Sequence, residues 1–217
     1  MKASSIIRTL LLVIIAIVGW YGLVLQLYLI IKKAGEEGTP MAGEVFRYFS
    51  YFTILTNLQV AVCVTFILLS PRSHAGRFFA RPAVQSAIAL YIMVVGITYS
   101  VALRHIWNPT GLQMVADRVL HDVIPVLFIF YWAFFVPKNS LTWSDPLWWL
   151  IYPFLYLVFV MTRGAITGEY PYYFLDPVSV EWPGVWMSIA ILFVGFAALG
   201  YLMVGISRLF YRQPHTL

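Results

Sequence analysis

The segment FSYFTILTNL places four hydrogen-bonding side chains in an otherwise apolar run without charge. These side chains belong to Ser50, Thr53, Thr56 and Asn57. On a helix, Ser50, Thr53 and Asn57 share one face, with Thr56 slightly to the side. A threonine hydroxyl becomes a nucleophile when a base takes its proton, and the Asn57 amide or the Thr56 hydroxyl could donate to the oxyanion that develops. The pattern suits attack on a carbonyl carbon by Thr53 or Thr56. The structural alternative is that such side chains bond neighbouring helices or their own turn.

Histidine is the residue that most readily serves as such a base near neutral pH, and His121 lies near the start of another apolar run. Asp117, four residues earlier, falls on the same face of a helix and could orient the imidazole as a triad carboxylate does. Asp122 lies off that face and could pair with Arg118, four residues before it. The alternative for His121 is an ordinary histidine at the membrane interface.

Pro125 follows His121 by four residues and affects how that histidine is held. If one helix runs through both residues, Pro125 has no N–H for the His121 carbonyl and the helix bends. If a helix begins near Ile124 instead, Pro125 is a first-turn proline. Either geometry places His121 at a break in regular helix, where a side chain can face a cavity.

Membrane-spanning helices must position these residues, because the 217-residue chain is 61% hydrophobic and only 11% charged. Soluble domains carry about 25% charged residues, and helices of roughly 20 apolar residues cross a bilayer. Six runs are long enough or nearly so, at about 9–31, 48–70, 82–103, 119–136, 146–162 and 183–207. We therefore expect an all-α integral membrane protein, a six-transmembrane-helix bundle that forms a single transmembrane domain over 1–217.

The distribution of basic residues predicts which ends of the spans face the cytoplasm. The N-terminus, the second and fourth loops and the C-terminus would share one side and hold eight Lys and Arg, against six on the other side. Those eight are Lys2, Arg8, Arg72, Arg77, Arg81, Lys138, Arg208 and Arg212. The more basic side is usually cytoplasmic. We therefore expect both termini in the cytoplasm of a multi-pass cell-membrane protein, with Thr53 and His121 at similar depth near the outer leaflet.

Further polar residues gather at the same predicted outer ends, which suggests a substrate site there. Arg104 ends the third span and Arg163 the fifth, where either could bind a free carboxylate of a substrate by charge-assisted hydrogen bonds. Tyr170 and Tyr172 lie in the loop sequence GEYPYYFLDP and are candidate substrate contacts. The alternatives are structural, since the arginines could pair with outer acids or reach head groups, and the tyrosines could anchor the interface.

Three motifs in order, together with the six spans, resemble the androgen-induced-protein-like family of six-span membrane proteins in its bacterial branch. The motifs are YFSYFTILTNL, LHDVIPVLF and MTRGAITGEYPYYFLD, and the resemblance runs from about Phe46 to Asp176. Eukaryotic members of that family are intramembrane threonine hydrolases that cleave fatty acid esters of hydroxy fatty acids. The resemblance implies a catalytic pair of Thr53 and His121, with Thr56 leaving the register of the threonine open.

The leading hypothesis is a hydrolase of lipid-like carboxylic esters, whose partners are membrane lipids and the substrate, and which needs no cofactor and no metal. The alternative is a non-enzymatic six-span protein that binds lipids, transports a solute or serves as a partner subunit. Nucleic-acid binding is not expected, because the basic residues flank the apolar runs and form no patch. The single cysteine, Cys63, permits no intramolecular disulfide.

A metal or haem site is the third hypothesis. Zinc hydrolases use about three protein ligands. His105 and His121 could supply two of them, and Asp117 or Asp122 the third, if the fold brought these side chains together. The remaining histidines, at the predicted inner ends of the spans, are His74 and His215.

Overall fold

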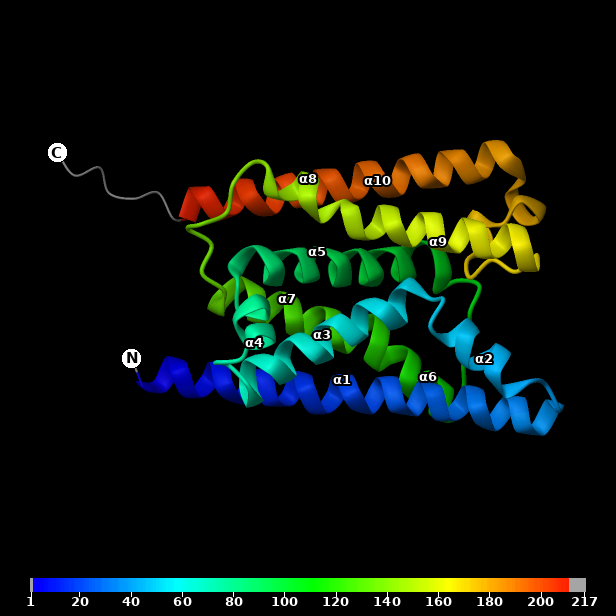
Figure 1. Cartoon of the computed structure of the whole chain (residues 1–217), viewed down its shortest axis with the longest axis horizontal. Helices are drawn as coiled ribbons and strands as arrows, with labels where there is room; N and C mark the ends of the chain where they lie inside the picture. Colours follow the sequence, from blue (N-terminus) through cyan, green and yellow to red (C-terminus); the bar gives the residue numbers. More distant parts are fainter. Residues whose placement is uncertain (1, 211–217) are drawn as a thin grey trace. The chain divides into compact units, whose positions relative to one another are not determined.

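The computed structural model describes residues 2–210, and those residues form helices and no strand (Figure 1). Arg212 and His215 lie outside the described residues. The first part of the chain holds α1 (Lys2–Glu37), α2 (Met41–Tyr48), α3 (Phe52–Leu69), α4 (His74–Phe79), α5 (Pro82–Thr98), the π-helix η1 (Tyr99–Leu103), α6 (Gly111–Arg118), the π-helix η2 (Val119–Val123) and α7 (Ile124–Phe135). The second part holds α8 (Asp145–Trp149), α9 (Ile151–Thr167), the 3-10 helix η3 (Tyr173–Leu175) and α10 (Pro177–Phe210).

Six helical segments of the described chain are long and apolar enough to cross a membrane, which confirms the predicted fold class. They are Ser4–Glu37, Phe52–Leu69, Pro82–Leu103, Gly111–Phe135, Asp145–Thr167 and Pro177–Leu209. The third of them matches its predicted range, 82–103, at both ends. By the length and composition of its helices, the chain is a multi-pass membrane protein.

The fourth span begins at Gly111, earlier than the predicted start at 119. Residues 111–118 were not recognised as part of the span because Asp117 and Arg118 lower the mean hydropathy of this stretch. Asp117 is nevertheless buried among other side chains of the chain and does not face lipid. The short apolar run read from the sequence is therefore only the later part of one continuous helical segment, α6–η2–α7.

Contacts along the chain define two compact units, and the single transmembrane domain stays a prediction. Unit 1 is Met1–Val136 and unit 2 is Pro137–Leu217. Residues 136–144, between α7 and α8, form turns and loop. A stretch without helix is typical of a boundary between compact units.

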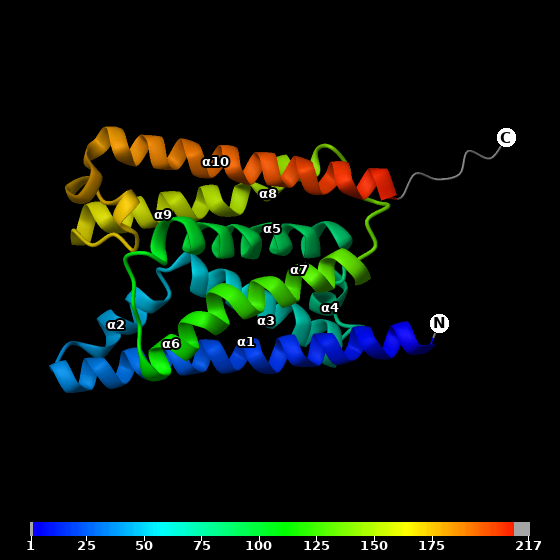
Figure 2. The same cartoon turned by 180° about the vertical axis from the view of Figure 1, so that it is seen from behind.

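In unit 1, α3 and the segment α6–η2–α7 lie between α1 and α5 (Figure 1 and Figure 2). α1 packs against both of these segments, and α5 packs against α3 and α7. The approach of α1 to η2 is close, because a Cβ added at Gly22 would lie 2.5 Å from Val119 Cγ1. The core between the helices includes the fully buried side chains of Val60, Phe128 and Tyr131.

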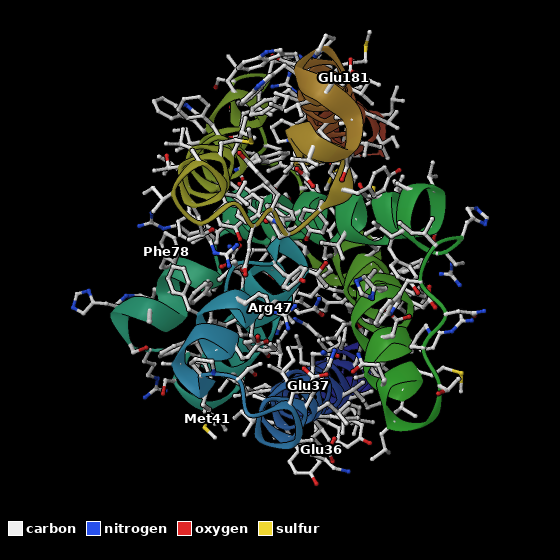
Figure 3. All side chains as sticks on the ribbon, turned by 90° about the vertical axis from the view of Figure 1, so that its right-hand side faces the viewer. Glu36, Glu37, Met41, Arg47, Phe78 and Glu181 are labelled. Atoms are coloured by element: carbon white, nitrogen blue, oxygen red, sulfur yellow. The ribbon has the colours of Figure 1, made fainter. Side chains whose placement is uncertain are left out.

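α2 closes the end of unit 1 at which α3 begins. Its last residue, Tyr48, is buried in a cluster with Leu120 and donates a hydrogen bond to the Leu23 carbonyl at 2.8 Å. Burial raises the pKa of the Tyr48 phenol, so the hydroxyl stays protonated and remains a donor. Figure 3 views this end of unit 1, with Met41 at its edge and Arg47 nearer its centre. The hydrogen bond of Tyr48 thus holds the chain just before α3 against α1.

In unit 2, the loop that holds η3 joins α9 to α10, and α10 contacts both η3 and α8. α10 is bent at Glu181, whose backbone has φ 55° and ψ 165° (labelled in Figure 3). Pro183 follows and lacks the N–H that would continue a regular helix across the bend. Glu181 is the one non-glycine residue among those described that has a positive φ.

Replacing Glu181 with glycine is expected to stabilise the protein. Residues other than glycine at such a backbone conformation cost roughly 1–3 kcal/mol, whereas the extra freedom of unfolded glycine offsets up to about 1 kcal/mol. We expect a net gain of about 1 kcal/mol, seen as a higher thermal midpoint in detergent. Glu181→Ala is the control, because it keeps a Cβ and should leave the midpoint near that of the wild type. An unchanged midpoint for Glu181→Gly would mean that the strain at the bend is no larger than the offset of about 1 kcal/mol from the unfolded glycine.

Candidate functional site

The polar residues of the FSYFTILTNL segment are buried in unit 1, but they do not share one helix. α3 begins at Phe52, so Ser50 lies in the turn before it and donates its hydroxyl to the Phe46 carbonyl at 2.8 Å. Thr53, with 8% of its surface exposed, and the fully buried Thr56 lie on α3. The predicted pattern on a single helix is therefore wrong for Ser50, because the chain turns between α2 and α3. Both threonines remain candidate nucleophiles.

Asn57 joins α3 to η2, the turn that carries His121. Its amide nitrogen donates to the Thr53 carbonyl at 2.9 Å and to the Leu120 carbonyl at 3.1 Å. A primary amide has two hydrogens to donate, and both are used here. Asn57 was a predicted donor to an oxyanion, but in this geometry it has no N–H left for one. What it does is hold the first turn of α3 against the residue next to His121.

Two buried polar atoms on this face, the Thr56 hydroxyl oxygen and Asn57 Oδ1, have no hydrogen-bond partner among the described residues. Leaving a buried polar group without a partner costs roughly 1–3 kcal/mol, and such groups commonly mark a site or a bound water. The amide oxygen Oδ1 can only accept a hydrogen bond, whereas a hydroxyl can also donate one. Thr56 is therefore better suited than Asn57 to donate to an oxyanion beside Thr53.

His121 lies in η2 and is held by Asp117 from the preceding turn. Its Nδ1 is 3.0 Å from the Asp117 carbonyl oxygen and 3.2 Å from the carboxylate oxygen Oδ1. A carbonyl oxygen only accepts, so Nδ1 must carry the hydrogen. In the neutral ring Nε2 then has a lone pair and can take a proton. The predicted contact between Asp117 and His121 is present, and it determines which nitrogen can act as a base.

Tyr99 completes this cluster, although it is not among the site residues predicted from the sequence. Its ring stacks on the His121 imidazole, with centroids 4.0 Å apart and an angle of 16° between the planes. Its hydroxyl donates to the Asp117 carboxylate oxygen Oδ2. Tyrosines are common near the ends of membrane spans, so the residue type alone carried no signal. The only signal in the sequence is its position near the end of the predicted span 82–103.

Both sides of the cluster are built on π turns. In η1 the N–H of Arg104 bonds to the Tyr99 carbonyl, five residues back, at 2.8 Å, and η2 has the same pattern. One helical segment runs through His121 and Pro125, which was one of the two predicted geometries, and the break takes the form of a π turn. α5 packs directly on it, because a Cβ added at Gly96 would lie 3.4 Å from the His121 carbonyl oxygen. Such turns occur frequently at functional sites.

Arg104 and Arg118 share the carboxylate of Asp122. Arg118 makes the predicted contact at 3.0 Å, and Arg104 bonds to the other carboxylate oxygen. Arg104 also lies 3.3 Å from the Ser100 hydroxyl, with its guanidinium over the Tyr99 ring, 5.0 Å from the centroid. Pairing with an acid was the structural alternative for Arg104. A substrate carboxylate would have to share this guanidinium with Asp122, so the binding role of Arg104 stays a prediction.

The other predicted substrate contacts lie in unit 2 and have partners there. Arg163 is buried at the end of α9 and donates to the Glu169 carbonyl at 2.7 Å and to its carboxylate at 2.8 Å. The Tyr170 ring packs so closely on Gly164 that a Cβ added to the glycine would overlap it. Tyr172 stacks on a neighbouring phenylalanine ring with centroids 5.2 Å apart. These contacts order the loop between α9 and η3, and substrate binding by the three residues remains a prediction.

The ligand set of the metal hypothesis is not assembled within residues 2–210. No three side chains of His, Cys, Asp or Glu in this range gather closely enough to hold one ion. His105 is exposed in the turn that follows η1. Asp117 instead contacts His121 and Tyr99, and Asp122 contacts two arginines.

No protein-family model matches the chain, and no curated protein or solved structure matches it. The resemblance to the androgen-induced-protein-like family therefore stays a prediction from the three motifs.

Proposed function

We propose that this protein is an intramembrane hydrolase of lipid-like carboxylic esters, with Thr53 as nucleophile and His121 as base. The observation that carries the proposal is the contact of His121 Nδ1 with the Asp117 carbonyl oxygen, because it requires Nδ1 to donate and leaves Nε2 as a proton acceptor. Asn57 supports it by bonding the turn that holds Thr53 to the residue before His121. The three sequence motifs support the same assignment.

In the proposed reaction the Thr53 hydroxyl attacks the carbonyl carbon of the ester while its proton passes to His121 Nε2. The former carbonyl oxygen becomes negative and accepts a hydrogen bond from the Thr56 hydroxyl. His121 then gives its proton to the departing alkoxide oxygen, which releases an alcohol and leaves the acyl group on Thr53. Water, deprotonated by the same nitrogen, cleaves the acyl-threonine to a carboxylic acid and restores both side chains.

The substrate in this proposal is an ester with long apolar chains that enters from the lipid. A site on membrane-spanning helices is open to apolar molecules dissolved in the bilayer, whereas water-soluble esters reach it poorly. Arg104, whose guanidinium lies 5.0 Å from the centroid of the Tyr99 ring, would bind a free carboxylate on the substrate in exchange for part of its contact with Asp122. We place the protein in the cell membrane with both termini in the cytoplasm, as the basic residues favour.

Labelling with a fluorophosphonate probe tests the nucleophile, because the probe forms a covalent bond with activated hydroxyls. We expect the wild type and Thr56→Ala to be labelled, Thr56→Ala more slowly, and Thr53→Ala not to be labelled. Thermal midpoints of the three proteins show whether each substitution leaves the fold intact. Labelling of Thr53→Ala but not of Thr56→Ala would assign the nucleophile to Thr56. Equal labelling of all three proteins, or none, would rule out a threonine hydrolase.

A further inference from the structure

We infer that Tyr99 is the positioning residue for His121, with its ring fixing the plane of the imidazole and its hydroxyl fixing the Asp117 carboxylate. The effect on catalysis rests on the proposed function. The effect of Tyr99 on the imidazole itself does not depend on that function, so the effect on catalysis and the effect on the imidazole can be tested separately. Tyr99 comes from α5 and η1, whereas Asp117 and His121 come from α6 and η2, so the cluster joins two helical segments.

The imidazole of His121 is restricted in two directions, one by the Tyr99 ring and one by Asp117. The two rings are nearly parallel, at 16°, with centroids 4.0 Å apart, so the imidazole cannot tilt toward Tyr99. Rotation within the plane is opposed by the bonds from His121 Nδ1 to Asp117. A base that is held in one orientation reaches the transition state without first being ordered, which is the benefit of a positioned catalytic group.

The hydroxyl of Tyr99 acts through Asp117. One carboxylate oxygen, Oδ2, accepts from Tyr99, and the other, Oδ1, lies 3.2 Å from His121 Nδ1. The Asp117 side chain is 4% exposed, so water offers it little alternative hydrogen bonding. A buried carboxylate that loses a donor turns toward any other donor available. Without the Tyr99 hydroxyl, Asp117 would therefore hold the Nδ1 hydrogen less firmly.

The backbone around both rings is shaped for this contact. Tyr99 is the first residue of η1 and His121 the middle residue of η2. A π turn contains one more residue than an α-helical turn, which changes the direction in which the following side chains point. Gly96, one turn before Tyr99, allows α5 to approach the carbonyl of His121. The two π turns thus face each other across a close helix contact.

Histidine nitrogen NMR of the isotope-labelled protein in detergent tests the inference without requiring any substrate. The His121 signals are assigned by their loss in His121→Ala. We expect wild-type His121 to be almost wholly in the form with hydrogen on Nδ1. Tyr99→Phe, which keeps the ring and removes the hydroxyl, should show a mixture of the two neutral forms. Tyr99→Leu, which removes both, should show a larger share of the form with hydrogen on Nε2.

The matched control is Tyr91→Phe, since Tyr91 is a buried tyrosine two turns earlier in α5. It should leave the His121 signals and the hydrolysis rate as in the wild type. With an ester substrate, kcat should fall roughly 10-fold in Tyr99→Phe and roughly 100-fold in Tyr99→Leu, with KM little changed. Thermal midpoints identify a variant that fails to fold, and Tyr99→Phe, the milder change, then carries the test.

The possible outcomes separate the two proposals. Unchanged His121 signals in Tyr99→Phe would overturn the positioning role, even if kcat fell. Changed signals in a protein whose wild type cleaves no ester would support the positioning role and refute the proposed hydrolase. A change of equal size in Tyr91→Phe would show that the signals report general loosening of α5, which would also overturn the inference.

Discussion

The substitution His121→Ala is expected to reduce the rate of ester hydrolysis by roughly 10²–10⁴-fold, the range that a positioned general base contributes. The substitution removes the nitrogen that takes the Thr53 proton and later returns it to the leaving alkoxide. The Asp117 carboxylate and the Thr56 hydroxyl would remain in place, so binding should change less than the rate. In steady-state kinetics with a long-chain ester in mixed micelles, we expect the loss to appear in kcat rather than in KM.

His105→Ala is the control for this variant, because it removes a histidine close in sequence whose side chain is exposed in the turn after η1. Its rate should stay within a few-fold of the wild type. Loss of activity in both variants to the same degree would indicate damage to the end of unit 1 rather than loss of a base. Full activity in His121→Ala would refute the proposed mechanism outright.

The contact of His121 Nδ1 with Asp117 orients the imidazole. Such a contact occurs both in catalytic triads and around histidines with a purely structural role. A structural histidine at an interface also donates one ring N–H to a nearby oxygen. What favours a base here is the surrounding set of groups. The carboxylate of Asp117 can stabilise the positive ring that forms on protonation. The buried Thr56 hydroxyl, which has no partner among the described residues, lies on the helix that contacts η2.

The spans could be predicted from the sequence because their apolar runs dominate every other local signal. The range 82–103 was predicted at both ends, since polar residues flank it on each side. The fourth span was predicted too short because hydropathy counts Asp117 as exposed to lipid. A carboxylate inside a span is compatible with a membrane when side chains of the same protein surround it and donate to it. That information is in the tertiary structure and not in the local sequence.

The site could be predicted in part, at the level of helical spacing. Asp117 and His121 are four residues apart, and so are Arg118 and Asp122, and both contacts occur. Tyr99 could not be found in this way, because its contact with His121 joins segments that are far apart along the chain. The π turns were also hidden. Pro125 indicated a break in regular helix, but the sequence did not specify which form it would take.

Asp117→Asn is expected to lower kcat by roughly 10²–10³-fold, less than the roughly 10⁴-fold that the same substitution costs in the serine-protease triad. One oxygen of the Asp117 carboxylate accepts a hydrogen bond from Tyr99, and the other lies 3.2 Å from His121 Nδ1. An asparagine amide has one oxygen and one NH₂ group, so it cannot accept from both Tyr99 and His121. If its NH₂ faces His121, Nδ1 must accept, the ring hydrogen moves to Nε2, and the base is lost. If its oxygen faces His121, the Tyr99 hydroxyl loses its acceptor and the ring keeps a weaker partner.

The backbone carbonyl of Asp117 limits the loss, because it still accepts from Nδ1 at 3.0 Å and favours the active form of the ring. Asp122→Asn is the matched control, since Asp122 is a nearby acid whose partners are two arginines and not the imidazole. We expect Asp122→Asn to keep a hydrolysis rate within a few-fold of that of the wild type. In Asp117→Asn, the His121 NMR signals should shift as they do in Tyr99→Phe. Equal losses in the two asparagine variants would mean that Asp117 acts through the general charge of this end of unit 1. In that case the hydrogen on Nδ1 would not be what makes His121 a base.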